Sequence, residues 1–172
     1  LRQLGCNIDY LGQAGYPPLR LQPGRLEFGE LAPIRVRGDV SSQFLTALLL
    51  SLPLICDGGP RIIEVEGELI SRPYIDITLK LLQRFGIEVE REGWHRFTVR
   101  QGSSYRSPGH IHVEADASSA SYFIALGAIA ADRSALRIEG VGSDSIQGDI
   151  RFVDAALEKK KKIESGPGWL EV

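Results

Sequence analysis

The chain has 172 residues, of which 43% are hydrophobic and 24% are charged, and its formal net charge at pH 7 is −2. This length suits one ordinary domain or two small ones, and the near-neutral charge gives no electrostatic reason to expect nucleic acid or a membrane surface as a partner. The longest apolar stretch, residues 44–56, is interrupted by polar residues and by Pro53 and is too short to span a bilayer. We expect a globular protein.

Cysteine and histidine usage argues against a metal or redox centre. Cys6 and Cys56 lie far apart with no second pair, which indicates neither a zinc site nor a disulfide framework and fits a reducing, cytoplasmic location. His110 and His112 flank one residue of an expected strand and would share a face, but no third ligand stands at a suitable spacing. Ordinary polar surface is the favoured interpretation, and we expect no metal and no cofactor.

Strands and helices alternate along the first two thirds of the chain. Residues 1–5 resemble the end of a helix closed by Gly5, and the chain contains no methionine and no visible signal or transit peptide. These features predict a segment of a longer polypeptide. The pattern predicts strands at 6–10, 19–21 and 33–37, a helix at 41–52, a strand at 61–66, a helix that starts between Ser71 and Pro73 and closes at Gly86, and a hairpin of strands at 87–91 and 96–100.

Both predicted helices have apolar residues at intervals of three and four, as expected of a face turned to a core. In the first helix these are Leu45, Leu48, Leu49 and Leu52, and in the second they are Tyr74, Ile77, Thr78, Leu81, Leu82 and Phe85.

The order of motifs then begins again at an offset of roughly 75 residues, the length of a compact repeat. The matching pairs are 34–36 with 111–113, 39–42 with 116–119, 65–67 with 138–140, and 76–77 with 149–150. The strand–helix–strand–helix–strand–strand order and its repetition predict a mixed α/β fold of repeated βαβαββ units, complete over about residues 30–112, with residues 111–113 as the first strand of the next copy.

Polar groups open the first predicted helix. Ser41, Ser42 and Gln43 fall in its first turn, where free backbone N–H groups and the positive end of the helix dipole favour an anion. On this local evidence alone, capping of the helix by Asp39 or Ser41 is the more common role.

The second helix also begins with polar groups, Ser71 and Tyr74. A tyrosine there could stack on, or hydrogen-bond to, a carbocycle or a sugar. Together the two helix starts indicate a phosphoanion and polyol site that needs no metal.

Four stretches of sequence carry a resemblance to a known family. They are SSQFLTALL at 41–49, SRPYIDITLK at 71–80, DASSASYF at 116–123 and QGDIRF at 147–152. Their order and spacing are similar to those of the 5-enolpyruvylshikimate-3-phosphate synthases (3-phosphoshikimate 1-carboxyvinyltransferases), which are enolpyruvyl transferases.

The resemblance implies a fold and an activity. Family members have two domains of three βαβαββ units each, an inside-out α/β barrel architecture, so residues 1–115 would end the first domain and residues 116–172 would start the second. The implied reaction transfers the enolpyruvyl group of phosphoenolpyruvate to shikimate-3-phosphate and releases phosphate, in the shikimate pathway of aromatic amino-acid biosynthesis. The implied partners are these two substrates and the remainder of the parent chain.

The resemblance also implies roles for single residues. Ser41, Ser42 and Gln43 would hold shikimate-3-phosphate, with Gln43 also reaching phosphoenolpyruvate, and Ser71 and Tyr74 would hold the same shikimate substrate. No catalytic acid or base of the family is identifiable in this segment, so we expect the isolated chain to be inactive.

One departure from the family is a lysine run, Lys159 to Lys162, where family members end a helix with glycine. Three alternatives stay open. They are the sister UDP-N-acetylglucosamine enolpyruvyl transferase, the RNA 3′-terminal phosphate cyclase, and a non-catalytic binding or assembly fragment.

Overall fold

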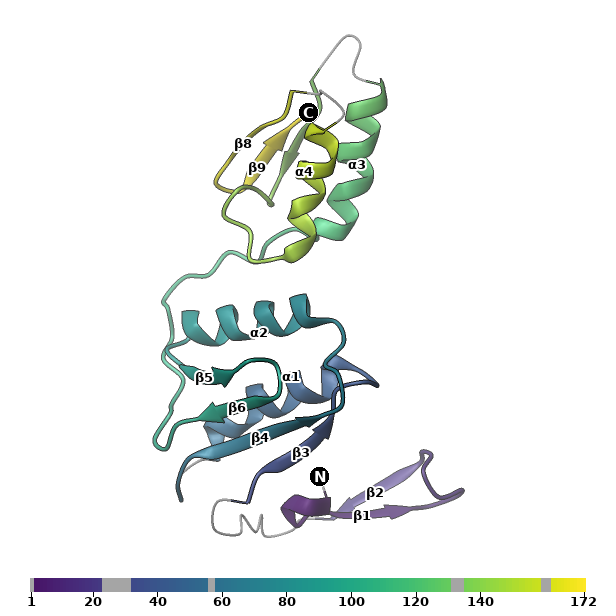
Figure 1. Cartoon of the computed structure of the whole chain (residues 1–172), viewed down its shortest axis with the longest axis vertical. Helices are drawn as coiled ribbons and strands as arrows, with labels where there is room; N and C mark the ends of the chain where they lie inside the picture. The colour runs from purple at the N-terminus through teal and green to yellow at the C-terminus, as the bar shows by residue number, and fades with distance from the viewer. Residues whose placement is uncertain (1, 23–31, 56–57, 131–134, 159–161) are drawn as a thin grey trace. The chain divides into compact units, whose positions relative to one another are not determined.

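The computed structural model describes residues 2–22, 32–55, 58–130, 135–158 and 162–172 (Figure 1). Cys56 and residues 159–161 of the lysine run lie outside the described residues. The chain forms two compact units, the first made of Leu1–Ile70 and Gly86–Tyr105 and the second of Ser71–Phe85 and Arg106–Val172. Helices and strands occur in both, which confirms the mixed α/β class.

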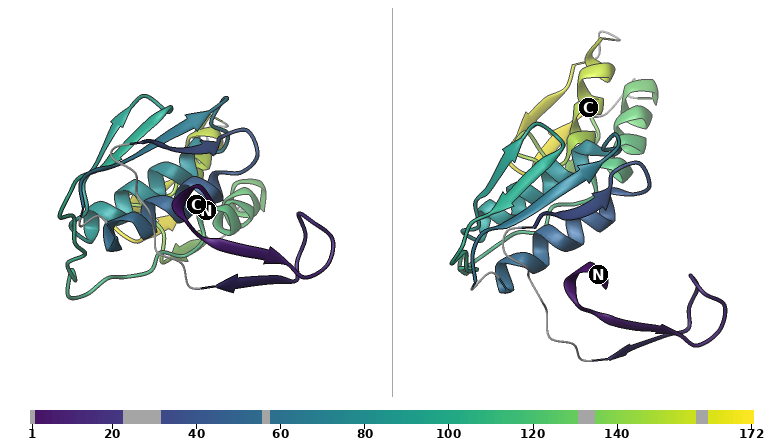
Figure 2. Two further views of the ribbon diagram at one scale, coloured as in Figure 1. Left: turned by 90° about the horizontal axis from the view of Figure 1, so that it is seen from below. Right: turned by 60° about the horizontal axis from the view of Figure 1, so that its bottom comes forward.

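A four-stranded sheet forms the centre of the first unit. In spatial order its strands are β3 (Ile34–Arg37), β4 (Arg61–Glu66), β6 (Arg96–Val99) and β5 (Val89–Glu92). The pair β3–β4 is parallel, and the other two pairs are antiparallel. Parallel neighbours need a crossover connection, which α1 (Ser42–Ser51) and the short 3₁₀ helix η2 (Leu52–Leu54) provide. In Figures 1 and 2 α1 runs along one face of this sheet.

The core of the first unit lies between α1 and the sheet. Leu45 and Leu49, one helical turn apart, are 1% and 0% exposed, and Ile63 and Phe97 of the paired strands β4 and β6 are each 0% exposed. Each such side chain stabilises the fold by roughly 1.5–3 kcal/mol through its burial. The predicted apolar face of the first helix is therefore confirmed.

The first unit also contains a hairpin at the amino-terminal end of the chain. The 3₁₀ helix η1 (Arg2–Leu4) ends at Gly5, whose φ of 81° suits glycine, and leads into β1 (Asn7–Tyr10). This strand pairs antiparallel with β2 (Leu19–Gln22), and most of the residues of both strands are exposed. The two strands were predicted within one or two residues of their bounds.

The second unit combines helices with a three-stranded antiparallel sheet. Its elements are α2 (Arg72–Arg84), α3 (Ala117–Ala130), β7 (Arg137–Glu139), the 3₁₀ helix η3 (Gly148–Arg151), α4 (Phe152–Leu157), β8 (Glu164–Gly166) and β9 (Trp169–Glu171). The sheet order is β7-β9-β8, and α3 and α4 lie side by side next to it (Figure 1). Ala117, Ala120, Ile124, Val141, Ala156, Leu170 and Val172 form the buried core of this part.

Two predictions need correction. Residues 111–113 do not form a strand, and the side chain of Val113 is 92% exposed. Alternation alone does not make a strand, because the backbone also needs a neighbour to pair with, and β7 pairs with β9 instead. The buried face of α2 is centred on Ile75, whose side chain is 0% exposed, whereas Tyr74 is 57% exposed. The helix itself was predicted correctly.

None of the described helices is both long and apolar enough to cross a membrane.

Candidate functional site

The turn between β3 and α1 is held against the segment that follows β4. The backbone N–H of Gly38 donates to the carbonyl of Glu66 at 2.9 Å, and the N–H of Ile70 donates to the carbonyl of Gly38 at 3.1 Å. A Cβ on Gly38 would lie 2.5 Å from Cγ1 of Val65 and 3.0 Å from Cα of Leu69, so only glycine fits. The close approach fixes the start of α1 beside the carboxyl end of β4, where ligands of parallel sheets commonly bind.

Ser41 is the N-cap of α1. Its backbone is extended, with φ −164° and ψ 137°, and its Oγ accepts a hydrogen bond from the N–H of Gln43 at 3.2 Å. The capping role is thus present, yet the Ser41 hydroxyl keeps its own proton for donation to a ligand. The side chain of Ser42 is buried at 8% exposure, and that of Gln43 is exposed. The helix start therefore combines a buried and a partly buried hydroxyl with an open amide.

The carboxylate of Asp39, close to the start of α1, is neutralised by Arg37. Asp39 accepts two hydrogen bonds from Arg37, Nε to Oδ1 at 3.0 Å and Nη2 to Oδ2 at 2.8 Å. The hydrogen bond and the positive charge of Arg37 lower the pKa of Asp39, and Asp39 raises the pKa of Arg37. Because the pair is locally neutral, Asp39 does not oppose an anion at Ser41 as a lone carboxylate would.

Ser71 has the most unusual backbone among the described residues. With φ 56° and ψ 39°, it is left-handed, and no other described residue except glycine has a positive φ. This conformation costs an L-residue roughly 1–2 kcal/mol, and such strain is concentrated at functional sites. Ser71 precedes α2 as its N-cap, but its side chain makes no cap hydrogen bond. The hydroxyl is therefore not committed to closing the helix.

Tyr74 lies in the first turn of α2, and its N–H donates to the carbonyl of Ser71 at 3.1 Å. Its ring is exposed although Ile75 beside it is buried. The structure thus brings Ser41, Ser42 and Gln43 together at one helix start of the first unit, and Ser71 and Tyr74 together at one helix start of the second unit.

The start of α3 resembles that of α1 in sequence but differs in chemistry. Asp116 accepts from the N–H of Ser118 at 3.0 Å and from Oγ of Ser119 at 2.6 Å, and the Ser118 hydroxyl donates to Asp149. The hydrogen bonds from Ser119 and from the Ser118 N–H lower the pKa of Asp116. Two carboxylates already occupy the donors here, so an anion would meet negative charge. An anion-binding helix start is better supported at α1 than at α3.

A polar cluster that the sequence did not reveal surrounds Glu114. Its carboxylate accepts hydrogen bonds from Oγ of Ser145 at 2.6 Å and from Nε2 of Gln147 at 3.2 Å, and it lies 3.5 Å from Nη2 of Arg84. Partial burial acts to raise the pKa of Glu114, but the hydrogen bonds and Arg84 outweigh it, so the pKa is lowered. No motif distinguishes Glu114 from other glutamates, because its partners are about 30 residues away in both directions.

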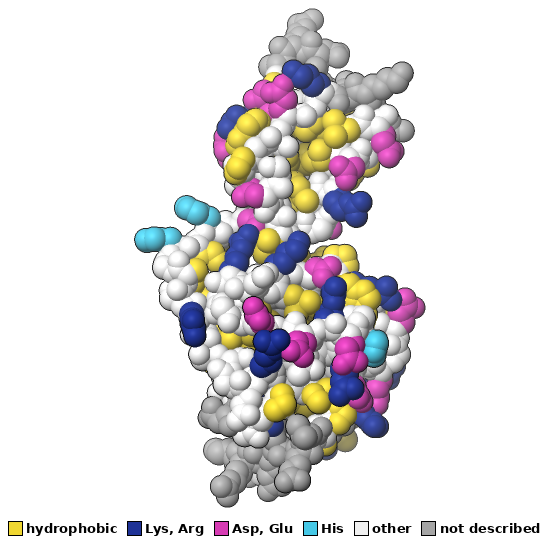
Figure 3. Space-filling view, turned by 60° about the vertical axis from the view of Figure 1, so that its left-hand side comes forward, with side chains coloured by type: hydrophobic (Ala, Val, Ile, Leu, Met, Phe, Trp, Pro, Cys, Tyr) yellow, Lys and Arg dark blue, Asp and Glu magenta, His cyan; other side chains and the backbone are white. Residues whose placement is uncertain are grey.

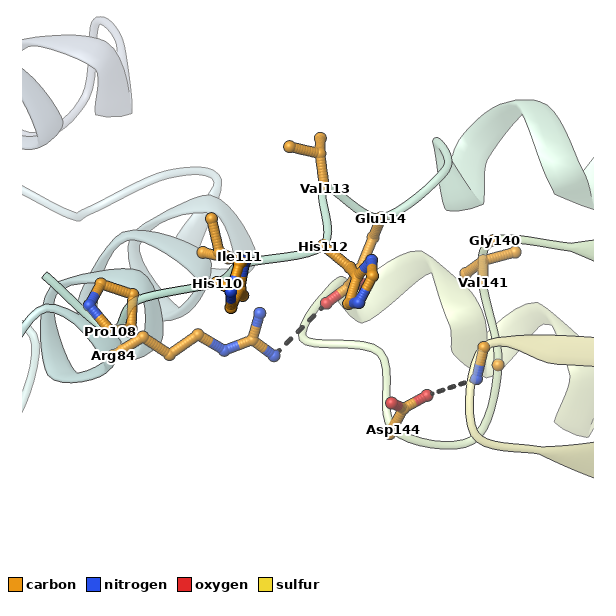
Figure 4. A pocket seen from close by; sticks show the side chains of 12 residues that line it. Arg84, Pro108, His110, Ile111, His112, Val113, Glu114, Gly140, Val141 and Asp144 are labelled. Atoms are coloured by element: carbon orange, nitrogen blue, oxygen red, sulfur yellow. Dashed lines mark hydrogen bonds and ion pairs between the residues drawn. The ribbon is translucent and has the colours of Figure 1, made fainter.

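A cavity of about 670 Å³ borders this cluster in the second unit (Figure 4). Its lining residues are Arg84, Pro108, His110, Ile111, His112, Val113, Glu114, Gly140, Val141, Gly142, Asp144 and Gly168. Figure 4 shows the Arg84 side chain directed at Glu114, and Asp144 accepts from the N–H of Gly168 at 2.8 Å. The charged side chains at its wall are thus engaged with protein partners.

The histidines do not assemble a metal site. All three are exposed, and Figure 3 shows histidine side chains projecting at the surface. Within the described part of the chain, no group of three or more His, Cys, Asp or Glu side chains is placed to hold a metal ion.

The structure thus defines a mixed α/β protein in which the first turn of α1 carries hydroxyl, amide and backbone N–H donors, groups that can hydrogen-bond to an anion. Comparison with known families is more specific, because the model of the EPSP synthase family (3-phosphoshikimate 1-carboxyvinyltransferase) matches residues 1–170. The chain belongs to the EPSP synthase family.

Individual relatives agree with this family assignment. The 3-phosphoshikimate 1-carboxyvinyltransferases of Cupriavidus taiwanensis and Cupriavidus necator are 62% and 60% identical to the chain over 173 aligned positions. That of Burkholderia ambifaria is 56% identical. In each case the match covers 100% of the chain and 39% of the relative, so the chain spans about two fifths of the length of these proteins.

Proposed function

We propose that this chain is part of an enzyme that transfers the enolpyruvyl group of phosphoenolpyruvate to shikimate-3-phosphate and releases phosphate. The observation that carries the proposal is similarity along the whole chain, 62% identity to a protein named for this activity, within a family match over residues 1–170. The remainder of a longer polypeptide would be the chain's partner in the reaction, and a cytoplasmic location belongs to the same proposal.

The start of α1 supplies the donors that a phosphate requires. Ser41 can donate its hydroxyl proton while its oxygen accepts from Gln43, so the cap and the ligand contact are compatible. Ser42 adds a second hydroxyl, and the orphan N–H groups of the first turn add the positive end of the helix dipole. We assign Ser41 and Ser42 to the phosphate of shikimate-3-phosphate.

Gln43 differs from its neighbours because its amide carries both donors and an acceptor on one plane. It is exposed at the helix start, in contrast to Ser42, so its amide is accessible to a ligand. This supports a position between the two substrates, with hydrogen bonds to shikimate-3-phosphate and to phosphoenolpyruvate.

Ser71 and Tyr74 supply a second contact to the shikimate substrate in this proposal. The left-handed backbone of Ser71, its lack of a cap hydrogen bond and the exposed ring of Tyr74 all support ligand roles over packing roles. Arg72 stands between them as the first residue of α2 and engages other groups of the protein.

The repeated-unit architecture and the domain boundary near Ala115 and Asp116 are also part of the proposal. Local features support the repeat, since β4 and β7 are both followed by glycine with positive φ, 76° at Gly67 and 88° at Gly140. The compact units of the structure divide the chain differently, because Ser71–Phe85 and Arg106–Ala115 are grouped with α3 and α4. The boundary proposed near Ala115 and Asp116 is one between domains of the longer polypeptide, and it differs from the division between these two compact units.

Titration of the chain with three ligands tests the binding proposal. Calorimetry should detect shikimate-3-phosphate binding and no binding of UDP-N-acetylglucosamine or of a short RNA, which the two alternative enzymes would prefer. Binding of either alternative ligand in place of shikimate-3-phosphate would overturn the assignment.

The activity is tested on the longer polypeptide and on the chain alone. Phosphate release from phosphoenolpyruvate and shikimate-3-phosphate should be observed with the former. The 172-residue chain should give no product, because the reaction needs a catalytic acid and base and the sequence carries no recognisable acid or base of the family. Turnover by the chain, free of host enzyme, would contradict this part of the proposal.

A further inference from the structure

The carboxylate of Glu114 is the centre of a hydrogen-bonded cluster in the second unit. Besides the Ser145 hydroxyl at 2.6 Å and the Gln147 amide at 3.2 Å, it accepts from the backbone N–H of Ile146 at 3.2 Å. Arg84 approaches the same carboxylate to 3.5 Å. The Glu114 side chain is only 19% exposed, so these are partners in a partly desolvated setting, where charge-assisted hydrogen bonds gain strength.

Gln147 extends the cluster to the first residue of α3. Its Nε2 donates to the carbonyl of Ala115 at 2.7 Å, and its Oε1 accepts from the N–H of Ala117 at 2.9 Å. Both polar atoms of the amide are used, so the orientation of Gln147 is determined by its surroundings. The segment that enters α3 is thereby fixed to the loop that precedes η3.

Helix α2 contacts this part of the second unit near both of its ends, at Glu114 and at η3. Arg84 is the last residue of α2 and reaches Glu114. Near the other end, a Cβ on Gly148 would lie 3.2 Å from Cβ of Pro73, so the backbone of η3 closely approaches the first turn of α2. In addition, the N–H of Arg106 donates to the carbonyl of Phe85 at 2.8 Å.

We propose that Glu114 is a positioning residue that fixes the orientation of α2 through Arg84 and thereby places Ser71 and Tyr74 for their ligand. The role in ligand binding rests on the proposed function, since it is there that Ser71 and Tyr74 contact shikimate-3-phosphate. Glu114 touches no substrate in this scheme. It acts by combining one negative charge for Arg84 with several acceptor positions for the loop residues 145–147.

The chemistry of the side chain explains why glutamate is needed. Glutamine has the same shape but a single acceptor oxygen, and its NH₂ group would face donors, including Arg84. Aspartate keeps the charge but is one methylene shorter, so it cannot reach both Arg84 and Ser145 from the same backbone position. Either substitution should release α2 from the loop while leaving the buried core of the second unit intact.

The test uses the 172-residue chain labelled with ¹⁵N and its variants Glu114→Gln, Arg84→Gln and Arg84→Lys. The matched control is Glu139→Gln. It also removes an acid from an ion pair of the second unit, but this acid is exposed and its partner is Arg137. The readouts are the amide signals of Ser71, Tyr74 and Ala117, followed by titration with shikimate-3-phosphate. Arg84→Gln leaves the hydrogen bonds of Ser145 and Gln147 intact, so it decides the matter even where Glu114→Gln does not fold.

We expect Glu114→Gln and Arg84→Gln to shift the Ser71 and Tyr74 amide signals. Both should also weaken shikimate-3-phosphate binding roughly tenfold, the size of effect that the loss of one charge-assisted interaction produces. Arg84→Lys should keep most of the normal amide signals and of the binding affinity, and the Glu139→Gln control should change neither the signals nor the affinity. A purely structural role would lower overall stability without moving these two signals.

Unchanged Ser71 and Tyr74 signals in a folded Arg84→Gln chain would overturn the positioning role. If the unsubstituted chain binds no shikimate-3-phosphate, the proposed ligand is wrong, and the amide signals still decide whether Glu114 positions α2.

Discussion

The Oγ of Ser41 accepts a hydrogen bond from the backbone N–H of Gln43 at 3.2 Å, which ties the Ser41 side chain to the backbone of a second candidate residue at the start of α1. The contact satisfies one orphan N–H of the helix and leaves the hydroxyl proton of Ser41 and the amide of Gln43 available to a ligand. Stability and binding can therefore be separated by substitution at these two positions.

Gln43→Ala in the longer polypeptide should weaken both shikimate-3-phosphate and phosphoenolpyruvate, whereas Ser41→Ala should act mainly on shikimate-3-phosphate. Each lost hydrogen bond to a charged group costs about 1.5–3 kcal/mol, or roughly ten- to a hundredfold in affinity. Calorimetric titration measures both constants. The matched control is Ser51→Ala at the other end of α1, where the hydroxyl donates to the carbonyl of Ala47. Unchanged affinities in the Gln43 variant would leave Gln43 as an ordinary surface residue.

Ser41→Ala should also lower the stability of the isolated chain by about 1 kcal/mol, because it removes the N-cap of α1. Gln43→Ala keeps the capping oxygen and should leave stability nearly unchanged. Urea unfolding of the two variants checks this. Equal destabilisation by both would mean that the cap hydrogen bond contributes little to the fold.

Ser71→Gly separates backbone strain from the role of the hydroxyl. Glycine adopts the left-handed conformation without steric cost but gains freedom in the unfolded chain, so stability should rise by between zero and about 1 kcal/mol. Ser71→Ala keeps the strain. Both variants lose the hydroxyl, and both should bind shikimate-3-phosphate more weakly. Unfolding and titration on the same samples check the pair, and full affinity in both would remove Ser71 from the site.

Gly38→Ala should destabilise the first unit by about 1–3 kcal/mol, because the added Cβ would meet Val65 Cγ1 at 2.5 Å and backbone atoms of residues 68 and 69 at 3.0–3.1 Å. The Gly12→Ala control has no atom within 4 Å of the new Cβ and should be nearly neutral. Adding Val65→Ala removes the Cγ1 clash and should recover part of the loss in a double-mutant cycle. A neutral Gly38→Ala would show that the β3–α1 turn can move away from β4.

The lowered pKa of Glu114 predicts how stability depends on pH. Because the folded pKa lies below the ordinary value of 4.5, the unfolded chain binds more protons in this range, so the contribution is present above about pH 4.5 and is lost as pH falls through the folded pKa. Ser145→Ala removes a donor to the carboxylate and should move the pKa of Glu114 upward. Carboxyl ¹³C shifts followed through the titration measure it. An unmoved pKa would show that the Ser145 hydrogen bond does not stabilise the charged form.

The sequence by itself determined the family, the α/β class and the positions of the helices and strands between residues 6 and 100. Helix α2 is an example, because its periodicity, Ser71 at its start and Gly86 at its end are properties of consecutive residues. The candidate residues Ser41 to Gln43 were likewise found from their place before an apolar run.

Tertiary structure decided which of these local patterns are used. Residues 111–113 alternate like a strand, but none of the described strands pairs with them, and a strand's pairing partner is not encoded next to it in the sequence. The starts of α1 and α3 are similar in sequence, yet at α3 a distant acid, Asp149, accepts a hydrogen bond from the Ser118 hydroxyl, whereas at α1 the Ser41 oxygen caps the helix. The role of Glu114 could not be predicted from the sequence for the same reason. Its partners Arg84 and Ser145 are far from it in the chain, and only folding brings them close to its carboxylate.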